Sequence, residues 1–497
     1  MQFIPLIPED YREFFDAAHR ETSRLTYGTV LSDTQLEGEY ARSLKYAKTD
    51  PHLSVIALLD GKPVGICQLE VREYGEKYGW VHFYYIAPEE RGKGYGKQLV
   101  EYSAKYFRKL GLAQMFLKVG IPNVNAEMFY KRVGFMRKAN ADSDTSHMMV
   151  FHLGGLGFDI AEALKLYGNC DAYEVSDNTG GPSDNRYTMF ADFADGGKIV
   201  VKAARNGFTT PERVAGWAEL TEHYNSLGIY APNFVRNIHG EYSAVVGDYV
   251  IYAEELAKFE TDMSFDYDVS AEARLTTLGK VAANPLTPPL PWSSPYAMYD
   301  KFDDSDEYPE LYDNALNTIR KICEVSPIYA DRATTILSDY ERLRAEFEPV
   351  YRSLPKASFQ ADMNKSNLLF DNGAFVGLMD FNLSGTDAVI SYAMYEGFYY
   401  MTDDEIVTAI KTCDTTQVDE RIRRNFGYVA RMYKFGDAER FAFGKFYNIA
   451  APFWGAHFQK YGELVSVHGA EIVPQILDFI EWQMQRDVVY RQPDLVL

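Results

Sequence analysis

The sequence predicts a multidomain protein of mixed α/β (α+β) class. At 497 residues the chain is too long for a single hydrophobic core, and its length favours two or three domains. Short β-like apolar runs alternate with helical patterns over residues 1–153, whereas the part after a second β-rich stretch is mainly helical and aromatic-rich. Two polar segments, residues 91–96 and 362–380, interrupt these patterns and have the composition of phosphate-handling sites.

Composition excludes several classes of protein. The four cysteines are far apart, without a CxxC pair, which disfavours a disulfide framework or a zinc site and fits a reducing cytosol. We find neither an apolar stretch of membrane-spanning length nor a secretory signal. We therefore expect a cytoplasmic protein that does not bind membranes, and its oligomeric state stays open.

The net charge of −21 is unevenly distributed. Residues 1–150 hold 20 basic and 19 acidic side chains, so the acidic excess lies in the rest of the chain. Such a surface disfavours nucleic acid, because binding requires neutralised phosphates. It either attracts a cationic small molecule or simply keeps the protein in solution. We expect small-molecule acceptors as binding partners.

The N-terminal elements follow from periodicity and turn residues. Helices are expected over 3–25 and 33–48, followed by strands over 52–59, 64–71 and 80–87. A helix over 96–110 carries Leu99, Val100, Ala104 and Phe107 at helical spacing. A strand over 113–118, a short helix over 126–132 and a strand over 148–153 complete the set. Together they describe a domain over residues 1–153.

Glycines mark the next boundary. Residues 154–157 read Gly-Gly-Leu-Gly, and a helix is expected at 160–166, so residues 154–168 are expected to form a linker. A β-rich stretch over 172–203 opens the second domain, 169–497. The proline cluster Pro285–Pro291 predicts a surface loop between helices.

The first polar segment, Arg91-Gly92-Lys93-Gly94-Tyr95-Gly96, joins a strand that contains Ile86 to the helix that starts near Gly96. Glycines allow backbone N–H groups to turn toward one point without interference from a Cβ. The helix N-terminus adds a partial positive charge. This segment therefore predicts an anion site suited to a pyrophosphate.

A second motif adds specificity. The run Asn123-Val124-Asn125-Ala126-Glu127-Met128-Phe129-Tyr130 is followed by Gly134-Phe135. Together with Arg91, Gly94 and Gly96, these residues resemble the GNAT acetyltransferase family over roughly residues 1–153. The resemblance implies the GNAT fold and acetyl-CoA as the cofactor. It implies that Ile86 and residues 91–96, with Gly92 among them, bind the cofactor together with Asn123.

By the same resemblance, Tyr130 would protonate the departing thiolate. The alternative is an aromatic side chain that only packs beside Phe129. The sequence does not identify the general base. Glu70 and His82 are candidates, but each can equally be an ordinary polar residue on the face of a strand. Water can also take up the proton of the amine.

The second polar segment contains Asp362, Asn367 and Asp380. Between the last two, residues 368–370 and 376–379 read as two short strands around Asp371-Asn372-Gly373. Such a hairpin brings Asn367 and Asp380 to one end, where oxygen ligands suit Mg²⁺. Phosphoryl transfer requires such a metal site beside a base and a cation on the nucleotide phosphates.

Upstream, the strand over 196–202 ends at Lys202, a helix carries Glu219, and a further strand leads into Ala253-Glu254-Glu255-Leu256. Together these elements resemble the aminoglycoside phosphotransferase and choline-kinase-like family over roughly residues 165–497. The resemblance implies a two-lobed protein-kinase-like fold, with a small lobe over about 169–256 and a large lobe over about 257–497.

The family implies ATP or GTP and Mg²⁺ as cofactors. It makes Asp362 the catalytic base, Asn367 and Asp380 the metal ligands, and Lys202 the residue that orients the phosphates and pairs with Glu219. Glu254 and Leu256 belong to the segment that meets the adenine. One departure concerns the family's His-Gly-Asp, which here reads Gln360-Ala361-Asp362. Gln360 is expected to replace the histidine by hydrogen bonding.

The sequence thus favours a bifunctional transferase. One half would be an acetyl-CoA-dependent N-acetyltransferase and the other an O-phosphotransferase acting on small, including cationic and aminoglycoside-like, acceptors. Antibiotic resistance is one expected role. The alternatives are a metabolite kinase with a fused acetyltransferase, or a chain in which one half, such as a pseudokinase scaffold, only binds.

Overall fold

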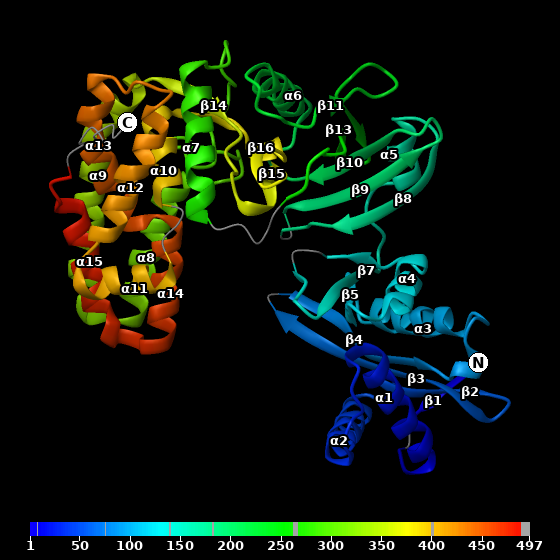
Figure 1. The fold of residues 1–497 in the computed structure, drawn as a ribbon. Coiled ribbons are helices and arrows are strands. Elements are labelled where there is room, and N and C mark those ends of the chain that lie inside the picture. Colours follow the sequence, from blue (N-terminus) through cyan, green and yellow to red (C-terminus); the bar gives the residue numbers. More distant parts are fainter. Residues whose placement is uncertain are drawn as a thin grey trace. The chain divides into compact units, whose positions relative to one another are not determined.

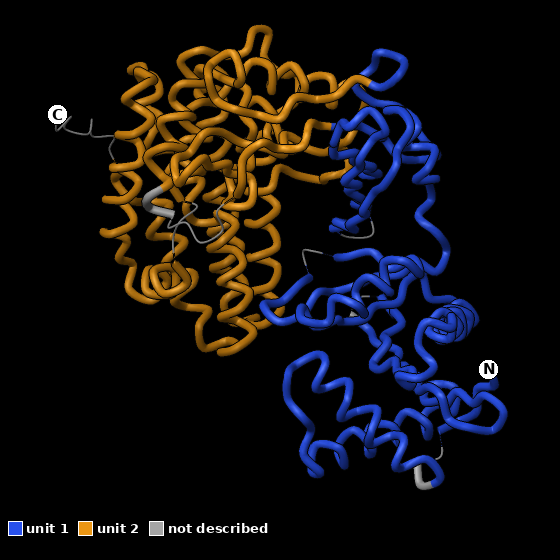
Figure 2. The backbone as a smooth tube through the Cα atoms, turned by 45° about the vertical axis from the view of Figure 1, so that its right-hand side comes forward, with its two compact units in different colours: residues 1–206, 237–253 blue, residues 207–236, 254–497 orange. Residues whose placement is uncertain are grey.

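The computed structural model describes residues 1–6, 8–74, 76–138, 141–180, 183–261, 267–398 and 402–488 (Figure 1). The chain divides into two compact units (Figure 2). Unit 1 contains residues 1–206 and 237–253, and unit 2 contains residues 207–236 and 254–497. Each unit is described by itself below.

The first part of unit 1 is a twisted sheet with helices on both faces. Its elements are β1 (Gln2–Pro5), α1 (Arg12–Tyr27), α2 (Asp33–Thr49), β2 (Ser54–Leu59), β3 (Lys62–Tyr74), β4 (Glu76–Ile86), α3 (Tyr95–Lys109), β5 (Gln114–Gly120), α4 (Val124–Arg132), β6 (Met136–Arg137) and β7 (Ser146–His152). The strand order is β1-β2-β3-β4-β5-β7-β6.

The chain start differs from the sequence expectation. A helix was expected from residue 3, but Gln2–Pro5 form β1, which pairs antiparallel with β2. The helix α1 starts only at Arg12. Proline has no backbone N–H to donate inside a helix, and Pro5 stands at the end of this edge strand, where the missing donor is tolerated.

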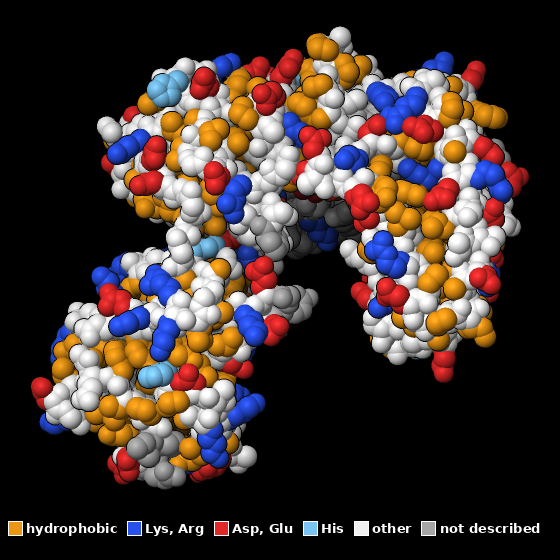
Figure 3. All heavy atoms as spheres, turned by 180° about the vertical axis from the view of Figure 1, so that it is seen from behind, with side chains coloured by type: hydrophobic (Ala, Val, Ile, Leu, Met, Phe, Trp, Pro, Cys, Tyr) orange, Lys and Arg blue, Asp and Glu red, His pale blue; other side chains and the backbone are white. Residues whose placement is uncertain are grey.

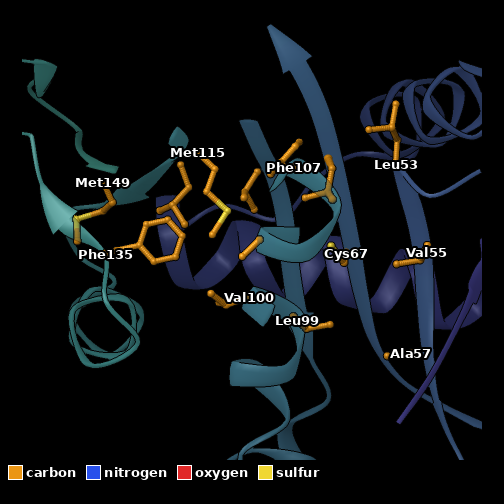
Figure 4. Packing of buried hydrophobic residues seen from close by; sticks show 14 of the residues in the cluster. Leu53, Val55, Ala57, Cys67, Leu99, Val100, Phe107, Met115, Phe135 and Met149 are labelled. Carbon is orange, nitrogen blue, oxygen red and sulfur yellow. The ribbon is translucent and has the colours of Figure 1, made fainter. Parts of the chain in front are cut away.

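Alternate strand residues fill two apolar cores, one on each face of this sheet. On one face Cys67 packs with Leu99, Val100 and Phe107 of α3 (Figure 4). On the other face Ile66, the neighbour of Cys67, packs with residues of α1 and β4. Burial on both faces explains the long apolar runs of β2 and β3 in the sequence.

A meander continues unit 1. It contains α5 (Ile160–Lys165), β8 (Cys170–Asp177), β9 (Asn185–Phe193), β10 (Lys198–Arg205), β12 (Ser243–Val246) and β13 (Tyr249–Glu255), of which residues 249–253 belong to this unit. The strand β8 meets β6 through the parallel pair Arg137↔Ser176. The buried Asp177 carboxylate accepts from Lys138 Nζ at 3.3 Å and lies 2.7 Å from His152 Nε2.

The compact unit therefore runs through the boundary expected at residues 154–168, because these strand and side-chain contacts join both sides of it. The expected small lobe, residues 169–256, is shared between the two units. That residues 1–153 and 169–497 fold independently, joined by a linker over residues 154–168, stays a prediction.

Unit 2 is mainly helical. Its helices are α6 (Pro211–Ser226), α7 (Tyr267–Ala283), α8 (Glu310–Val325), α9 (Ala330–Ser353), α10 (Val389–Phe398), α11 (Asp403–Thr412), α12 (Thr416–Ala430), α13 (Asp437–Ala450), α14 (Gly455–His468) and α15 (Val473–Gln485). Two small antiparallel sheets, β14 (Lys356–Phe359) with β17 (Gly385–Ala388) and β15 (Leu368–Asp371) with β16 (Ala374–Leu378), carry the second polar segment. The expected hairpin around Asn372-Gly373 is confirmed.

On the face shown in Figure 3, acidic and basic side chains are interspersed with apolar ones. Within the described ranges, every helix is too short or too polar to cross a membrane.

Candidate functional site

The glycine-rich turn lies open between β4 and α3. Gly92 and Gly94 adopt positive φ angles of 76° and 86°, and Gly94 is the residue that precedes the helix. A Cβ added at either position would meet no heavy atom within 4 Å. Both glycines are exposed beside a helix N-terminus, which suits an anion.

Gly96 has a different environment. A Cβ at this position would lie 2.9 Å from the Phe129 ring, so glycine allows α3 to pack closely against α4. A cofactor contact of Gly96 stays a prediction.

Arg91 is held at the end of β4. Its Nε donates to the Ile86 carbonyl at 2.9 Å, and its Nη2 lies 3.0 Å from Glu21 Oε1. Tyr85 donates to the other carboxylate oxygen of Glu21 at 2.7 Å. The structure thus brings Ile86 and Arg91 together, and it adds Glu21 of α1, which the sequence reasoning did not single out.

The strands β4 and β5 pair over a short stretch only. They are parallel neighbours at Gly79↔Met115 and Trp80↔Phe116. Past Trp80, the described residues of β4 have no partner on β5. The β3–β4 register also shifts here, since Gln68 faces Phe83 while Leu69 faces Val81, which leaves His82 as the extra residue of a bulge. The free edge of β4 leads from this point to the glycine-rich turn.

Asn123 begins α4. Its Oδ1 accepts from the Ala126 backbone N–H at 3.3 Å, which caps the helix. The structure therefore gives Asn123 a structural role, and its contact with a cofactor stays a prediction.

Tyr130 lies among aromatic rings, with centroids 5.4 Å from Phe129, 5.5 Å from Phe135 and 6.4 Å from Tyr84. Burial, with a smaller contribution from the nearby Cys67, raises the pKa of the Tyr130 hydroxyl. The hydroxyl is consequently protonated at neutral pH and can donate a proton or a hydrogen bond.

The two candidate bases have different surroundings. Glu70 lies opposite Trp80, where β4 still pairs with β5, and accepts from Arg72 Nε at 2.8 Å. His82 lies just past that point, with its Nε2 2.7 Å from Arg42 Nη1 and 3.3 Å from Glu39 Oε2.

Burial alone would raise the pKa of Glu39, but its hydrogen bond to His82 and the charge of Arg42 outweigh this and lower it. Glu39 and Arg42 come from α2, some forty positions before His82, and no local signal pointed to them.

The second polar segment forms a tight cluster in unit 2. Asn367 Nδ2 donates to Asp362 Oδ2 at 2.8 Å and to the Asp362 carbonyl at 3.0 Å. The Asn367 carbonyl accepts from the Met379 backbone N–H at 3.0 Å, next to Asp380. The hairpin β15–β16 thus brings the three predicted residues together, as its turn implied.

Gln360 connects the two ends of this cluster. Its buried side chain accepts from the Asp362 backbone N–H at 2.8 Å. Its Nε2 donates to the carbonyls of Met379 at 2.9 Å and Asp380 at 2.8 Å. The expectation that Gln360 acts by hydrogen bonding is confirmed by this geometry.

Backbone strain accompanies the cluster. Ala361 and Asp380 have φ angles of 62° and 59°, a region that residues with a Cβ rarely adopt. Such conformations persist where the surroundings hold them, often at functional sites. Burial and then the charge of Asp380 raise the pKa of Asp362 to about 6.

Mg²⁺ fits the chemistry of this cluster. Asn367 Nδ2 donates to Asp362, whereas Asn367 Oδ1 accepts only a long hydrogen bond from Ser366 Oγ, at 3.5 Å. This side-chain oxygen can therefore join the carboxylate oxygens as a hard ligand. The charge of Asp380 contributes to the raised pKa of Asp362, and a cation bound beside both carboxylates would offset this effect. Within the described ranges, no three His, Cys, Asp or Glu side chains gather as a metal site.

The remaining predicted nucleotide residues lie in two units. Lys202 is on β10 of unit 1, with its Nζ 5.9 Å from the centroid of the Tyr252 ring. Glu219 lies exposed on α6 of unit 2, where Glu254 is buried and Leu256 is 42% exposed. The Lys202–Glu219 pair and the adenine contacts stay predictions.

The N-terminal part of the chain is similar to known acetyltransferases. Residues 12–135 match the model of the Acetyltransferase (GNAT) family, which confirms that expectation for this part of the chain. An uncharacterized N-acetyltransferase of Methanocaldococcus jannaschii is 34% identical over 99 residues, or 18% of this chain. The chain spans only 42% of that relative's length.

Solved structures similar to this chain include phosphotransferases. One is an amicoumacin kinase in complex with AMP-PNP, Ca²⁺ and Ami, with 12% identity, a TM-score of 0.40, and coverage of 65% of this chain and 92% of that one. Another is an aminoglycoside phosphotransferase of Alicyclobacillus acidocaldarius, with 11% identity, a TM-score of 0.36, and coverage of 66% and 96%.

Proposed function

We propose that this chain is a bifunctional transferase, an acetyl-CoA-dependent N-acetyltransferase joined to an ATP- or GTP-dependent O-phosphotransferase. The observation that carries the proposal is the coexistence of two constellations in one chain. One is the open turn at Gly92 and Gly94, and the other is the Asp362–Asn367–Asp380 cluster held by Gln360.

In the acetyltransferase, the backbone N–H groups of the turn and the Arg91 guanidinium would bind the cofactor pyrophosphate. The cofactor arm would follow the unpaired edge of β4 toward His82. There an acceptor amine would attack the acetyl carbon and release its proton to His82, Glu70 or water. Tyr130, kept protonated by burial, would give its proton to the sulfur as the carbon–sulfur bond breaks.

In the phosphotransferase, Asp362 would accept the proton of the acceptor hydroxyl. Its raised pKa places the carboxylate near the working pH of a general base. Asn367 and Asp380 would hold Mg²⁺, which neutralises phosphate charge when bound. Lys202, paired with Glu219, would orient the phosphates, and the segment with Glu254 and Leu256 would meet the adenine.

The expected setting belongs to the same proposal. The four cysteines form no disulfide, which supports a location in the reducing cytoplasm. The acidic second half of the chain supports small cationic acceptors as partners rather than nucleic acid. Inactivation of an antibiotic is one role that fits.

The proposal is tested by an acceptor screen that follows CoA release and ADP release side by side on the full chain. We expect at least one amine to give CoA release and at least one alcohol to give ADP release. Activity confined to one product, with the other cofactor not bound, would show that one half is a binding module.

A further inference from the structure

A buried ionic contact in unit 1 joins residues 1–153 to the strand β8. The Asp177 side chain, at the end of β8, is fully buried and accepts from Lys138 Nζ at 3.3 Å. Its other carboxylate oxygen lies 2.7 Å from His152 Nε2. Lys138 directly follows β6, and His152 is the last residue of β7. We call these three side chains the Asp177 link.

The Asp177 carboxyl is ionised at neutral pH. Burial alone would raise its pKa, but the hydrogen bond to His152 and the charge of Lys138 act in the opposite direction. With a further hydrogen bond from the Thr179 backbone, they lower the pKa of Asp177 to about 2. A buried charge that loses one partner is strongly unfavourable. Removal of Lys138 should therefore disturb the backbone around Asp177.

The link also holds the first residues of the turn that follows β8. Lys138 Nζ donates to the Thr179 carbonyl at 3.0 Å. The Thr179 backbone N–H donates to Asp177 Oδ1 at 2.8 Å. Both backbone polar groups of Thr179 are thus bound by the link, which fixes the direction in which the chain leaves β8.

The strands β8, β9 and β10 lie side by side (Figure 1). Their register places Ser176, Thr188 and Lys202 in one row across the three strands. Residues in such a row share a face of the sheet, and the next residue along each strand lies on the opposite face. The link therefore holds β8 from the face opposite to that of Lys202.

Asn178 connects the turn to the Lys202 face. Its Nδ2 donates to Thr188 Oγ1 at 2.9 Å, and its backbone N–H donates to the Arg186 carbonyl at 2.8 Å. Thr188 is the direct cross-strand partner of Lys202. Asn178 stands between the two residues that the link binds. The position of the link therefore reaches the neighbour of Lys202 through one side chain.

We propose that Lys138 and His152 are positioning residues for nucleotide binding by the phosphotransferase half, although both belong to residues 1–153. Their contacts hold Asn178 and the start of the turn in the arrangement that a nucleoside triphosphate requires beside Lys202. The inference rests on the proposed role of Lys202 in the phosphotransferase. It goes beyond that role, because the nucleotide affinity of one half then depends on residues of the other.

The effect is expected on affinity rather than on the chemical step. When a turn has several arrangements, the apparent affinity falls with the fraction of chains in the binding-competent one. The proposed base Asp362 belongs to unit 2, whereas the link belongs to unit 1. Loss of the link should consequently change nucleotide affinity and leave kcat at saturating nucleotide nearly unchanged.

Lys138→Met tests the inference on the full chain, by calorimetry with AMP-PNP and Mg²⁺. We expect binding about three- to tenfold weaker than that of the unsubstituted chain, and a KM for ATP raised by a similar factor. Lys138→Arg keeps the charge and the donors, so it should restore most of the affinity. Acetyl-CoA affinity should be the same in all three proteins, because the glycine turn at residues 91–96 is intact.

Lys131→Met is the matched control. Lys131 of α4 forms an ion pair with Glu174, so it also joins residues 1–153 to β8. The Glu174 side chain is 51% exposed, and exposed ion pairs contribute little. This variant should bind AMP-PNP normally. An equal loss of affinity in the Lys131 and Lys138 variants would overturn the inference, since it would indicate a general loosening of β8.

A double-mutant cycle with Asp177→Asn separates the link from an unrelated loss of stability. Asp177→Asn alone should weaken AMP-PNP binding, and Lys138→Met should then add much less than it does alone, because contacting residues are not additive. Fully additive effects of the two substitutions would contradict the inference.

The same titrations distinguish the inference from the proposed function. If the unsubstituted chain does not bind AMP-PNP, the phosphotransferase and the inference are both contradicted. If it binds AMP-PNP and Lys138→Met leaves the affinity unchanged, the inference alone is overturned.

Discussion

Gln360 Nε2 donates a hydrogen bond to the Asp380 carbonyl at 2.8 Å. The same carboxamide accepts from the Asp362 backbone N–H at 2.8 Å. One buried side chain thus sets the distance between the proposed base and a proposed metal ligand, although twenty residues separate it from Asp380. The backbones of Ala361 and Asp380 are strained, and such conformations persist where the surrounding contacts hold them.

Gln360→Leu should keep the volume of this side chain and remove all three hydrogen bonds. We expect the kcat of ADP formation to fall roughly 10- to 100-fold, because small displacements of reacting groups cost about that much. Gln360→His should retain more activity than the leucine variant. An unchanged kcat in a folded leucine variant would show that the connection does not position the site.

Asp362→Asn and Asp380→Asn should have different effects. The first keeps shape and nucleotide binding but should lower turnover about 10²- to 10⁴-fold, the range of general-base catalysis. The second removes a ligand charge and should weaken nucleotide affinity in Mg²⁺. Nucleotide titrations and turnover separate the two. Near-normal phosphorylation by the Asp362 variant would show that Asp362 is not the general base.

Arg91→Glu combined with Gly94→Asp should abolish acetyl-CoA binding, because carboxylates would occupy an anion site at a helix N-terminus. ADP formation should continue. Lys105→Glu, an exposed position of α3 with the same charge change as Arg91→Glu, is the control and should bind acetyl-CoA normally. Loss of ADP formation in the folded double variant would show that the two activities are not independent.

Tyr130→Phe should keep the packing against Phe129 and Phe135 and lose only the hydroxyl. Acetyl transfer is expected to fall by about 10²-fold or more if the hydroxyl protonates the thiolate. Acetyl-CoA affinity and the melting temperature should stay close to those of the unsubstituted protein. Unchanged acetyl transfer would leave Tyr130 with a packing role only.

His457 should make unit 2 less stable in mild acid. Burial lowers the pKa of its imidazole to about 4, while its Nδ1 donates to the Ala451 carbonyl at 2.5 Å. An unfolded chain binds the proton near pH 6.5 and the folded one does not. The contribution of His457 to the free energy of unfolding is therefore fully present above about pH 6.5. It is lost as the pH falls toward 4, by on the order of 3 kcal/mol.

Urea unfolding at several pH values checks this dependence. His457→Phe should lower stability at neutral pH, since it leaves the Ala451 carbonyl without this donor, but it should flatten the decline below pH 6.5. The exposed His468→Gln is the control and should keep the decline. An equally steep decline in the phenylalanine variant would exclude His457 as its source.

The sequence by itself determined the local structure of the two polar segments. The glycine turn at 91–96 and the hairpin that joins Asn367 to Asp380 were predictable, because turn residues and short-range spacing fix both. Most of the other strands and helices of residues 1–153 were predictable from periodicity, which also depends on short-range spacing. The strand at Gln2–Pro5 was not, since its identity depends on pairing with β2, which lies fifty residues further along the chain.

Contacts between distant segments were decided only by the tertiary structure. The partners of His82 come from α2, and the apolar cavity of unit 2 is lined by segments that extend from Tyr296 to Gly455. Packing places such side chains together, and neither spacing nor periodicity encodes which face of a helix meets which loop. The composition could therefore indicate an acidic second half, but only the folded cavity shows a lining with one carboxylate among aromatic rings.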